Sequence, residues 1–559
     1  MSYLFSGLTK LTSLNISSFD TSKVSNMSSM FYSCSKLSYL DIKNFKTENV
    51  QDMSKMFNYC INLKILDIDI INFDTKNTKY FSQMFRQCEV LESLDVSKFN
   101  VENGIEFDEM FSSCKKIKKL DISNFRTKNG KDFSFMFSDC INLTSIDVSN
   151  FDTSKALYMS NMFYKCISIK SLNISGFKTD NVLSMVNMFY ECYNLEKLDF
   201  SNFNTKNVLE MNNMFASTSL KELDLSTFIT PNLNQITYMF RNCSLLEKIN
   251  IKNMITDDIT DFSGLFYDCV SLTSIDLSNF NTKRAKSFGS MFANCKKLSK
   301  INIENFNTTY VTNFFGMFQS CLSLKSLNIS HFNTENAISF SNMFYYCSSL
   351  TSLNLKNFNT YNLKEMKSMF EGCTSITELD LSNFNTNNIA SFSHLFSNCS
   401  SLVNINLSTW KTNSLTDMAY MFYQCSSLLS LDLSHFNTSN VGTLDSTFMG
   451  CELLTNLDLS NFQTNKVQYM YRTFENCLSL TSIILSNFKT DSVVVMDEMF
   501  RSCKNLKSLD LTSFDTRKCY SFRQVFEGYN GLVIYLIAAN NNILINSLPS
   551  YVSYIDVES

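Results

Sequence analysis

Residues 369–386 read MFEGCTSITELDLSNFNT, and close variants of this stretch recur along almost the whole chain. Its cysteine, Cys373, belongs to an unbroken row in which cysteines stand 26 residues apart from Cys243 to Cys503. A chain of 559 residues without repeats would suggest several globular domains, but a fixed period of roughly 20 to 50 residues predicts a solenoid. We therefore predict a stack of about twenty repeats.

The period is interrupted at a few places before Cys243. One gap of 28 residues follows from two extra residues near Ile70 and Ile71, and Thr218 stands where a cysteine is missing, in a repeat one residue short. Two adjacent repeats carry a glycine in place of an apolar residue, at Gly104 and Gly130. Because glycine weakens a helix, we expect looser helices from about residue 70 to 135, either as a hinge or as variation that a redundant stack tolerates.

Each repeat can be numbered from a threonine at position zero. Apolar residues then stand at +3, +6, +9 and +10, cysteine at +13, Leu or Ile at +16, +19 and +21, and Phe at +24. At 100° per residue, the positions from +3 to +13 fall within an arc of about 120°, which predicts a short amphipathic helix. The threonine recurs in 19 of 20 repeats, with Val101 the exception, and is predicted to be its N-cap; Pro231 directly follows Thr230, where a helix tolerates proline.

The alternation Leu66-Asp67-Ile68 and its equivalents predicts a short strand in every repeat. The expected fold is an α/β solenoid of strand-turn-helix units, with one stack over residues 1–530 and a C-terminal cap over 531–559. Strands about 4.8 Å apart opposite helices roughly 8–10 Å apart predict a curved or superhelical stack with a parallel sheet on its concave face. The N-terminal end is expected to be uncapped, with exposed apolar side chains at Leu4, Phe5, Leu8 and Leu11.

The segments Met369–Cys373 and Leu379–Thr386 resemble the BspA-like leucine-rich repeat surface proteins, a bacterial family with 26-residue repeats. The resemblance covers residues 4 to about 530. It implies a leucine-rich repeat fold, a place at the cell surface or in the medium, and non-enzymatic adhesion to a host, matrix or cell-surface protein. Residues 1–20 show no signal peptide, so an intracellular interaction scaffold in the cytoplasm of an anaerobic organism is the alternative.

Charge and hydropathy restrict the possible partners. The 48 basic and 52 acidic residues give a net charge of −4 without a basic stripe, so nucleic acid is not an expected partner. No stretch approaches the 18 apolar residues of a membrane span, so we expect no membrane insertion. The only substantial segment outside the repeat, 531–559, lacks His and Cys, and we therefore predict neither an enzyme nor a cofactor.

Position +20, in the middle of the predicted strand, holds Asp in twelve repeats, Asn in seven and Ile484 in one. Like charges on neighbouring strands, about 5 Å apart, repel unless they are screened, protonated or share a cation. Calcium, which prefers oxygen ligands, is a weak candidate for this row, and the alternative is a solvated ladder bonded to serine hydroxyls. The calcium candidates are Asp41, Asp67, Asp95, Asp121 and Asp147.

Charged residues replace serine beside this row in the central repeats. They turn a uniform face into a patterned one, and this is our predicted site for a protein partner; neutral drift at solvated positions is the alternative. The residues are Lys197, Glu222, Lys248, Lys252, Lys300, Glu304 and Lys356.

The remaining reactive and aromatic residues are predicted to be structural. Eighteen cysteines share position +13 and Cys519 lies at +3, which favours buried thiols and leaves disulfides between neighbouring repeats open. Phe at +24 recurs in 18 repeats, replaced by Met254 and by Trp410, and is predicted to be core. The three histidines are His331, His394 and His435.

Overall fold

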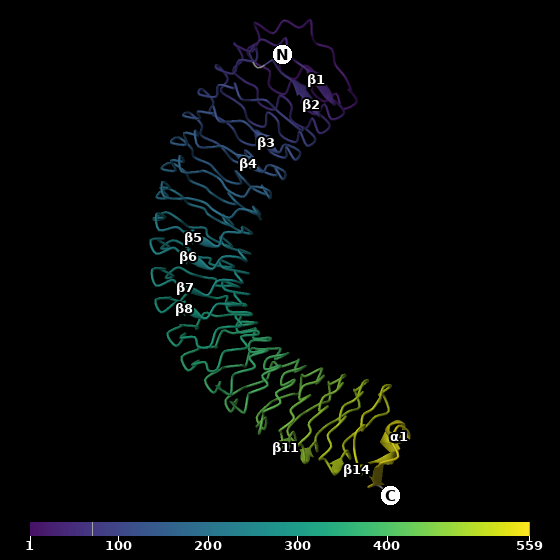
Figure 1. Ribbon diagram of the computed structural model, residues 1–559. Coiled ribbons are helices and arrows are strands. Elements are labelled where there is room, and N and C mark those ends of the chain that lie inside the picture. The colour runs from purple at the N-terminus through teal and green to yellow at the C-terminus, as the bar shows by residue number, and fades with distance from the viewer. Residues whose placement is uncertain (70, 558–559) are drawn as a thin grey trace. The chain divides into compact units, whose positions relative to one another are not determined.

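The computed structural model describes residues 1–69 and 71–557, so the predicted insertion at Ile70 lies outside the described residues. The chain divides into two compact units, Met1–Arg284 and Ala285–Ser559, which we call the first and second unit. In each unit, successive turns of about 26 residues stack in chain order (Figure 1). The repeat predicted from the sequence is therefore a solenoid turn.

Strands occupy positions +18 to +20 of many turns and are only two or three residues long. Within the first unit β1 pairs with β2, β3 with β4 and β5 with β6, all in parallel; in the second unit the parallel pairs are β9 with β10 and β11 with β12. The strands of the repeats are β1 (Tyr39–Asp41), β2 (Ile65–Asp67), β3 (Lys119–Leu120), β4 (Ser145–Ile146), β5 (Glu222–Asp224), β6 (Lys248–Asn250), β7 (Ser274–Asp276), β8 (Lys300–Asn302), β9 (Glu378–Asp380), β10 (Asn404–Asn406), β11 (Asn456–Asp458), β12 (Ser482–Ile484) and β13 (Ser508–Asp510).

Positions +4 to +12 form a second hydrogen-bonded column, which we call the turn ladder (residues 51–59 in one repeat). Every second amide in it donates to a carbonyl of the next turn. The amide of Lys55 reaches the carbonyl of Ser82 at 2.8 Å, and that of Phe57 reaches Met84 at 2.9 Å. In an α-helix these amides would bond within the same segment, so the turn ladder is not helical.

Two residues per repeat hold the turn ladder in its shape. In the four-residue turn 53–56, the amide of Met56 donates to the carbonyl of Met53 at 3.2 Å. Lys55, the third residue of this turn, has a φ of 59°. Residues 57–60 repeat this pattern, with a φ of 63° at Tyr59. A four-residue turn with positive φ at its third residue is of type II. Positions +8 and +12 are left-handed in this way along the chain.

The predicted helix from +3 to +13 is therefore wrong, although its inward positions are right. Phe31, Phe57 and Phe85, all at +10, are fully buried, and their rings stack at 5.6 and 5.5 Å. Packed helices lie roughly 8–10 Å apart, which is too far for such a stack. A train of type II turns places the same residues inward and also lets neighbouring backbones bond to each other.

The threonines at position zero do not cap helices. The Thr153 hydroxyl donates to the carbonyl of Lys178 at 2.9 Å and accepts from the amide of the same residue at 2.7 Å. Thr179 bonds Asn204 in both directions in the next turn. Each of these hydroxyls thus joins a buried corner of one turn to the next. The nineteen threonines at this position are buried.

The strand side is paired less continuously than the turn-ladder side. In the first unit, β-bridges at +5 continue through successive turns without a gap from Asn26 to Gln235, whereas the strands pair two by two. The rings of Phe125 and Phe151, at the corner after the strand, are 6.3 Å apart, but those of Phe111 and Phe137 under the turn ladder are 5.8 Å apart. The prediction of a concave strand face depended on wide helices opposite the strands, and the repeats that the structure describes have no helix there.

Gly104 and Gly130 do not loosen the stack. A side chain at either glycine would overlap the ring at +6 of the same turn, since an added Cβ would lie 2.4 Å from Phe107 and 2.5 Å from Phe133. These two rings stack at 5.4 Å. The predicted loosening is therefore wrong at these two glycines, because each one makes room for a larger aromatic residue at the next inward position.

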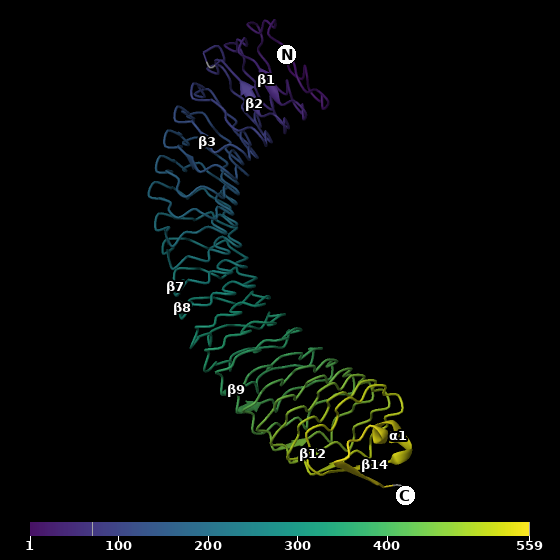
Figure 2. The same cartoon turned by 45° about the vertical axis from the view of Figure 1, so that its right-hand side comes forward.

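The predicted cap, residues 531–559, contains β14 (Leu532–Leu536), α1 (Ala538–Asn546) and β15 (Val552–Asp556). Both strands continue β13 in parallel, and α1 lies beside β14 at the end of the second unit (Figure 2). Asn541, within α1, is buried and accepts a hydrogen bond from the Thr516 hydroxyl at 3.1 Å. Asn541 thus gives the hydroxyl of Thr516, the last threonine at position zero, a hydrogen-bond partner within the cap. No helix among the described residues is long and apolar enough to cross a membrane.

At the other end of the chain, Leu4 and Leu8 are exposed, as predicted. Phe5 and Leu11 are half-buried.

Candidate binding surfaces

The aspartates at +20 lie on the exposed strand side. Asp41 and Asp67 face each other in register, and the Lys43 ammonium lies 2.5 Å from the Asp67 carboxylate. Asp95, Asp121 and Asp147 each accept the amide of the serine two residues later, at 3.0 to 3.1 Å.

Hydrogen bonds from these serines lower the pKa of Asp121 and Asp147. Within residues 1–69 and 71–557, no group of three or more Asp, Glu, His or Cys side chains could hold a metal ion. The observed bonds match the alternative of a solvated ladder bonded to serine.

Four of the predicted partner residues lie together on the strand side of the first unit. Lys197 and Glu222 line a shallow groove of about 1090 Å³. Lys248, one turn further along, forms an ion pair with Glu222 at 2.9 Å, and both side chains are largely exposed. Lys252 is exposed two residues beyond β6. The groove lies between the bridge of Ser171 with Lys197 and the pair β5–β6, where strand pairing is interrupted.

The other three predicted partner residues, Lys300, Glu304 and Lys356, belong to the second unit and are exposed. Lys300 starts β8, and the amides of Glu304 and Lys356 each bond an asparagine side chain in the same turn.

The turn ladder forms a second exposed surface, which was missed in the sequence because its residues were assigned to a helix. Sixteen of the 24 tyrosines occupy positions +4 to +12, whereas Tyr39 is the one tyrosine at strand positions +18 to +22 of the repeats. The four cation–π contacts found among the described residues also lie on the turn ladder. Tyrosine and arginine are enriched at protein interfaces, so this surface has the composition of a contact face.

A groove of about 1160 Å³ crosses the turn ladder in the second unit. Phe315 and Tyr345 form part of its wall, and His394 lies at one end with its ring stacked on Tyr420 at 4.5 Å. The Nδ1 atom of His394 is 3.7 Å from the carboxylate of Glu371. Burial lowers the pKa of His394, and Glu371 opposes that shift.

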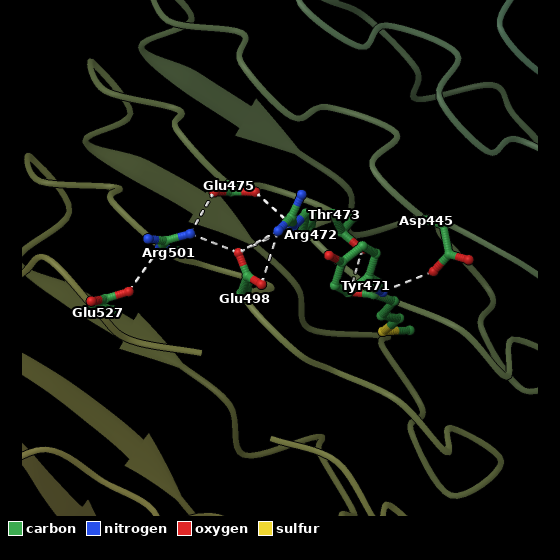
Figure 3. Close-up of polar contacts among 9 residues, drawn as sticks. Asp445, Tyr471, Arg472, Thr473, Glu475, Glu498, Arg501 and Glu527 are labelled. Carbon is green, nitrogen blue, oxygen red and sulfur yellow. Dashed lines mark hydrogen bonds and ion pairs between the residues drawn. The ribbon is translucent and has the colours of Figure 1, made fainter. Parts of the chain in front are cut away.

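A cluster of charged side chains lies on the turn ladder near the end of the second unit (Figure 3). Arg472 and Arg501 both reach Glu498, at 3.0 and 2.8 Å, and Glu475 lies between the two arginines. Arg501 also pairs with Glu527 at 2.7 Å. Burial raises the pKa of Glu475 while both arginines lower it. Since these arginines are already neutralised, the cluster joins turns to each other and is not a free anion site.

The cysteines at +13 form a buried column under the turn ladder. The Cys60 thiol donates to the carbonyl of Phe31 at 3.2 Å, and Cys114 repeats the contact with Phe85 at 3.2 Å. All nineteen cysteines are buried in the structure. Burial raises the pKa of Cys140 to about 12. The contacts match the prediction of a structural thiol at each position.

Other residues predicted to be structural lie in the core or at its corners. Trp410 is fully buried, and its indole N–H donates to the carbonyl of Leu381 at 3.1 Å. The Nε2 atoms of His331 and His435 lie 3.2 and 2.7 Å from backbone carbonyls of the preceding turn. Their imidazoles thus occupy the corner where other turns carry asparagine.

Comparison with known families identifies the repeat. A family model described as "Mycoplasma protein of unknown function, DUF285" matches seven overlapping stretches, residues 1–125, 62–171, 136–252, 234–352, 324–430, 375–484 and 445–533. The chain belongs to this family. None of the curated proteins matches it. The predicted membership of the BspA-like surface proteins is a finer assignment than this match shows.

Among solved structures, the chain is similar to a leucine-rich repeat protein from Bacteroides ovatus, at 18% identity and a TM-score of 0.35, over 75% of this chain and 87% of that one. It is also similar to a leucine-rich repeat protein from Eubacterium ventriosum, at 16% identity and a TM-score of 0.32, over 65% and 83%. A leucine-rich cell surface protein from Faecalibacterium prausnitzii matches at 17% identity and a TM-score of 0.28, over 55% and 77%.

Proposed function

We propose that the chain is a non-enzymatic binding module that attaches to proteins of a host, a matrix or another cell. The observation that carries this proposal is the presence of two exposed faces in the turns, the strand side and the turn ladder, whose outward residues vary while the buried residues repeat. A solenoid of this kind offers an extended surface, and the variable outward positions supply specificity.

On the strand side, the proposed contact is the groove between Lys197 and Glu222, together with Lys248 and Lys252. The Lys248–Glu222 pair is solvent-exposed and contributes little to stability, so these charges can change partners at small cost. Opposite charges on a partner would then steer its approach.

The test couples the full chain to fluorescent beads and measures their adhesion to cultured cells, with and without trypsin treatment of the cell surface. We expect saturable adhesion that trypsin abolishes. A triple charge reversal, Lys197→Glu with Lys248→Glu and Lys252→Glu, is expected to reduce adhesion at least fivefold. A triple reversal of exposed lysines at positions +1 and +2, outside both surfaces, Lys23→Glu with Lys206→Glu and Lys283→Glu, should change it less than twofold. Adhesion that survives trypsin, or no adhesion at all, would contradict protein attachment.

An intracellular interaction scaffold is the second candidate, and the buried thiols favour it. Protein thiols persist in reducing compartments, whereas exported proteins commonly carry disulfides. Antibody detection on intact and on permeabilised cells of the source organism separates the two candidates: staining that requires permeabilisation supports the scaffold and excludes a surface adhesin.

A further inference from the structure

The groove on the turn ladder of the second unit lies where outward side chains are short. Position +8 carries a large side chain at Tyr420 and Arg472, but a small one at Gly316 and Ser368. The groove, of about 1160 Å³, crosses the turns of these two small residues and is lined by side chains between Phe315 and His394. It therefore extends over four successive turns of the second unit.

Two side-chain amides line this groove without a partner in the protein. At the same position +8 in the first unit, Asn187 donates its amide to the side-chain oxygen of Asn161 at 2.9 Å. Asn342 has only a glycine and a serine as neighbours at +8, and its side chain forms no hydrogen bond to any residue that the structure describes. Gln319, at +11 of the preceding turn, likewise has no side-chain partner among residues 1–69 and 71–557. Each amide can both donate and accept a hydrogen bond.

An exposed aromatic ring forms part of the groove wall. Phe315 is 41% exposed and stands at +7, where the next turn carries Ser341. Tyr345 adds a second ring with a hydroxyl group. An aromatic face beside a few convergent polar groups is the usual composition of a small-ligand site. A sugar ring needs both features, because it has an apolar C–H face and hydroxyl groups around its rim.

The lysines and glutamates of the groove belong to one turn and balance each other. Lys364 and Lys367 are matched by Glu365 and Glu371. Burial lowers the pKa of His394, so its imidazole adds no charge at pH 7. The groove therefore has no net charge that would attract a polyanion or an acidic peptide, and an uncharged ligand is favoured.

The backbone beneath the groove is already paired, which disfavours an extended peptide. The amides of Gly316, Asn342 and Ser368 donate to carbonyls of the following turn at 2.9, 3.0 and 3.1 Å. A peptide that binds as an added strand gains its affinity from main-chain bonds to an unpaired edge, and these amides are not available to it. The groove offers side-chain hydroxyl and amide groups instead.

We propose that this groove binds a short, uncharged oligosaccharide. One sugar ring stacks its C–H face on Phe315, and its hydroxyl groups bond to the amides of Gln319 and Asn342. The four turns cover three rung spacings, roughly 15 Å, which leaves room for further sugar rings in line. The inference goes beyond the proposed attachment to proteins, because it assigns another class of ligand to a site on the turn ladder of the second unit.

The test applies the purified, fluorescently labelled full chain to an array of neutral oligosaccharides, acidic oligosaccharides and random peptides. We expect saturable binding to neutral oligosaccharides that changes less than twofold between about 50 mM and about 500 mM salt. Phe315→Ala should weaken this binding at least tenfold, and Asn342→Arg, which fills the groove, at least fivefold. Tyr310→Ala removes an aromatic ring that is 62% exposed in the same turn as Phe315 but outside the groove, and should change binding less than twofold.

Three results would overturn the proposal: no binding to any neutral oligosaccharide, a more than tenfold loss of binding at the higher salt concentration, or unchanged binding by both groove variants. Binding to peptides alone would also overturn it, in favour of a peptide site. Circular dichroism checks folding, and arginine is tolerated at +8, since Arg472 has a φ of 54° there. The strand-side reversal Lys197→Glu with Lys248→Glu and Lys252→Glu should leave binding to the array unchanged, so the two proposals can fail separately.

Discussion

Individual residues carry an unusual backbone conformation throughout this protein. The structure has 36 non-glycine residues with positive φ among those described, and none of them is Val, Ile or Thr. Branching at Cβ makes the left-handed region costly, whereas Asn, Asp, Ser and Gly tolerate it better. This exclusion at +8 and +12 was visible in the sequence and is the signal that separates a train of turns from a helix.

Ser113, at +12 with a φ of 58°, provides a direct test of this conformation. Ser113→Gly is expected to stabilise the fold by up to about 1 kcal/mol, because glycine adopts this φ without strain. Ser113→Val should destabilise it by roughly 1–2 kcal/mol. Midpoints of urea unfolding measure both changes, with Ser113→Ala as the reference. In a helix the glycine variant would instead be the less stable one, so the sign of its effect decides between the two structures.

The cysteine column makes a second prediction, which concerns reactivity. Since burial raises the pKa of Cys140, Cys347 and Cys451 to about 12, only about one in ten thousand of these thiols is ionised at pH 8. Native protein is therefore expected to react very slowly with a disulfide reagent such as DTNB. In guanidinium chloride, all nineteen cysteines should react. A lower count after unfolding would show disulfides between neighbouring turns.

At the scale of the element, the conformation of a segment depends on the neighbouring turns that it contacts. The inward positions +3, +6, +9, +10 and +13 were predicted correctly, because a row of buried side chains has the same spacing in a helix and in a train of type II turns. The conformation of the segment from +3 to +13 was predicted wrongly, because its hydrogen bonds run to the next turn and not along the chain. The threonine hydroxyls show the same dependence, since their partners are 25 residues away.

The threonine contact can be tested by exchanging one hydroxyl for a methyl group. Thr153→Val removes both bonds to Lys178 and leaves a buried amide and carbonyl unpaired, which should cost about 1–3 kcal/mol. Hydrogen exchange of residues 145–185 is expected to become faster. The reciprocal variant, Val101→Thr, adds the hydroxyl that its repeat lacks and should slow exchange around Arg126. No change in the first variant would contradict a structural role for the hydroxyl.

At the scale of the whole molecule, small effects add because each one recurs in almost every turn. The thiols are the clearest case. A thiol whose folded pKa lies above its unfolded value of about 8.5 stabilises the fold fully below pH 8.5, and this contribution is lost as the pH rises. Above pH 8.5, each buried thiol lowers the free energy of unfolding by about 1.4 kcal/mol per pH unit, because the thiol ionises in the unfolded state and not in the folded one. The expected result is cooperative loss of structure between about pH 9 and 10.

Circular dichroism from pH 7 to pH 10.5 measures this transition. A variant with Cys114→Ala, Cys140→Ala and Cys166→Ala should shift its onset in the first unit to higher pH, because three ionising groups are removed. Preserved structure at pH 10.5 would contradict the linkage between the thiols and stability.

The candidate surfaces show the same division between what repeats and what varies. Lys197 and Glu222 could be selected from the sequence because they depart from a serine pattern on a strand that was correctly placed. The tyrosine-rich surface of the turn ladder could not, since its positions were predicted to lie in a helix. Only the register of the turn ladder brings residues at the same position of successive turns into adjacent rungs.

The period, the buried positions and the strand side follow from the amino-acid sequence alone, because burial repeats with the chain and each turn has to hide the same apolar residues. The conformation of the turn ladder, its tyrosine-rich surface and the pairing of the two sides are decided only in the tertiary structure. They depend on hydrogen bonds and ring stacks between residues about 26 positions apart, where each turn supplies the backbone partners that its neighbour lacks.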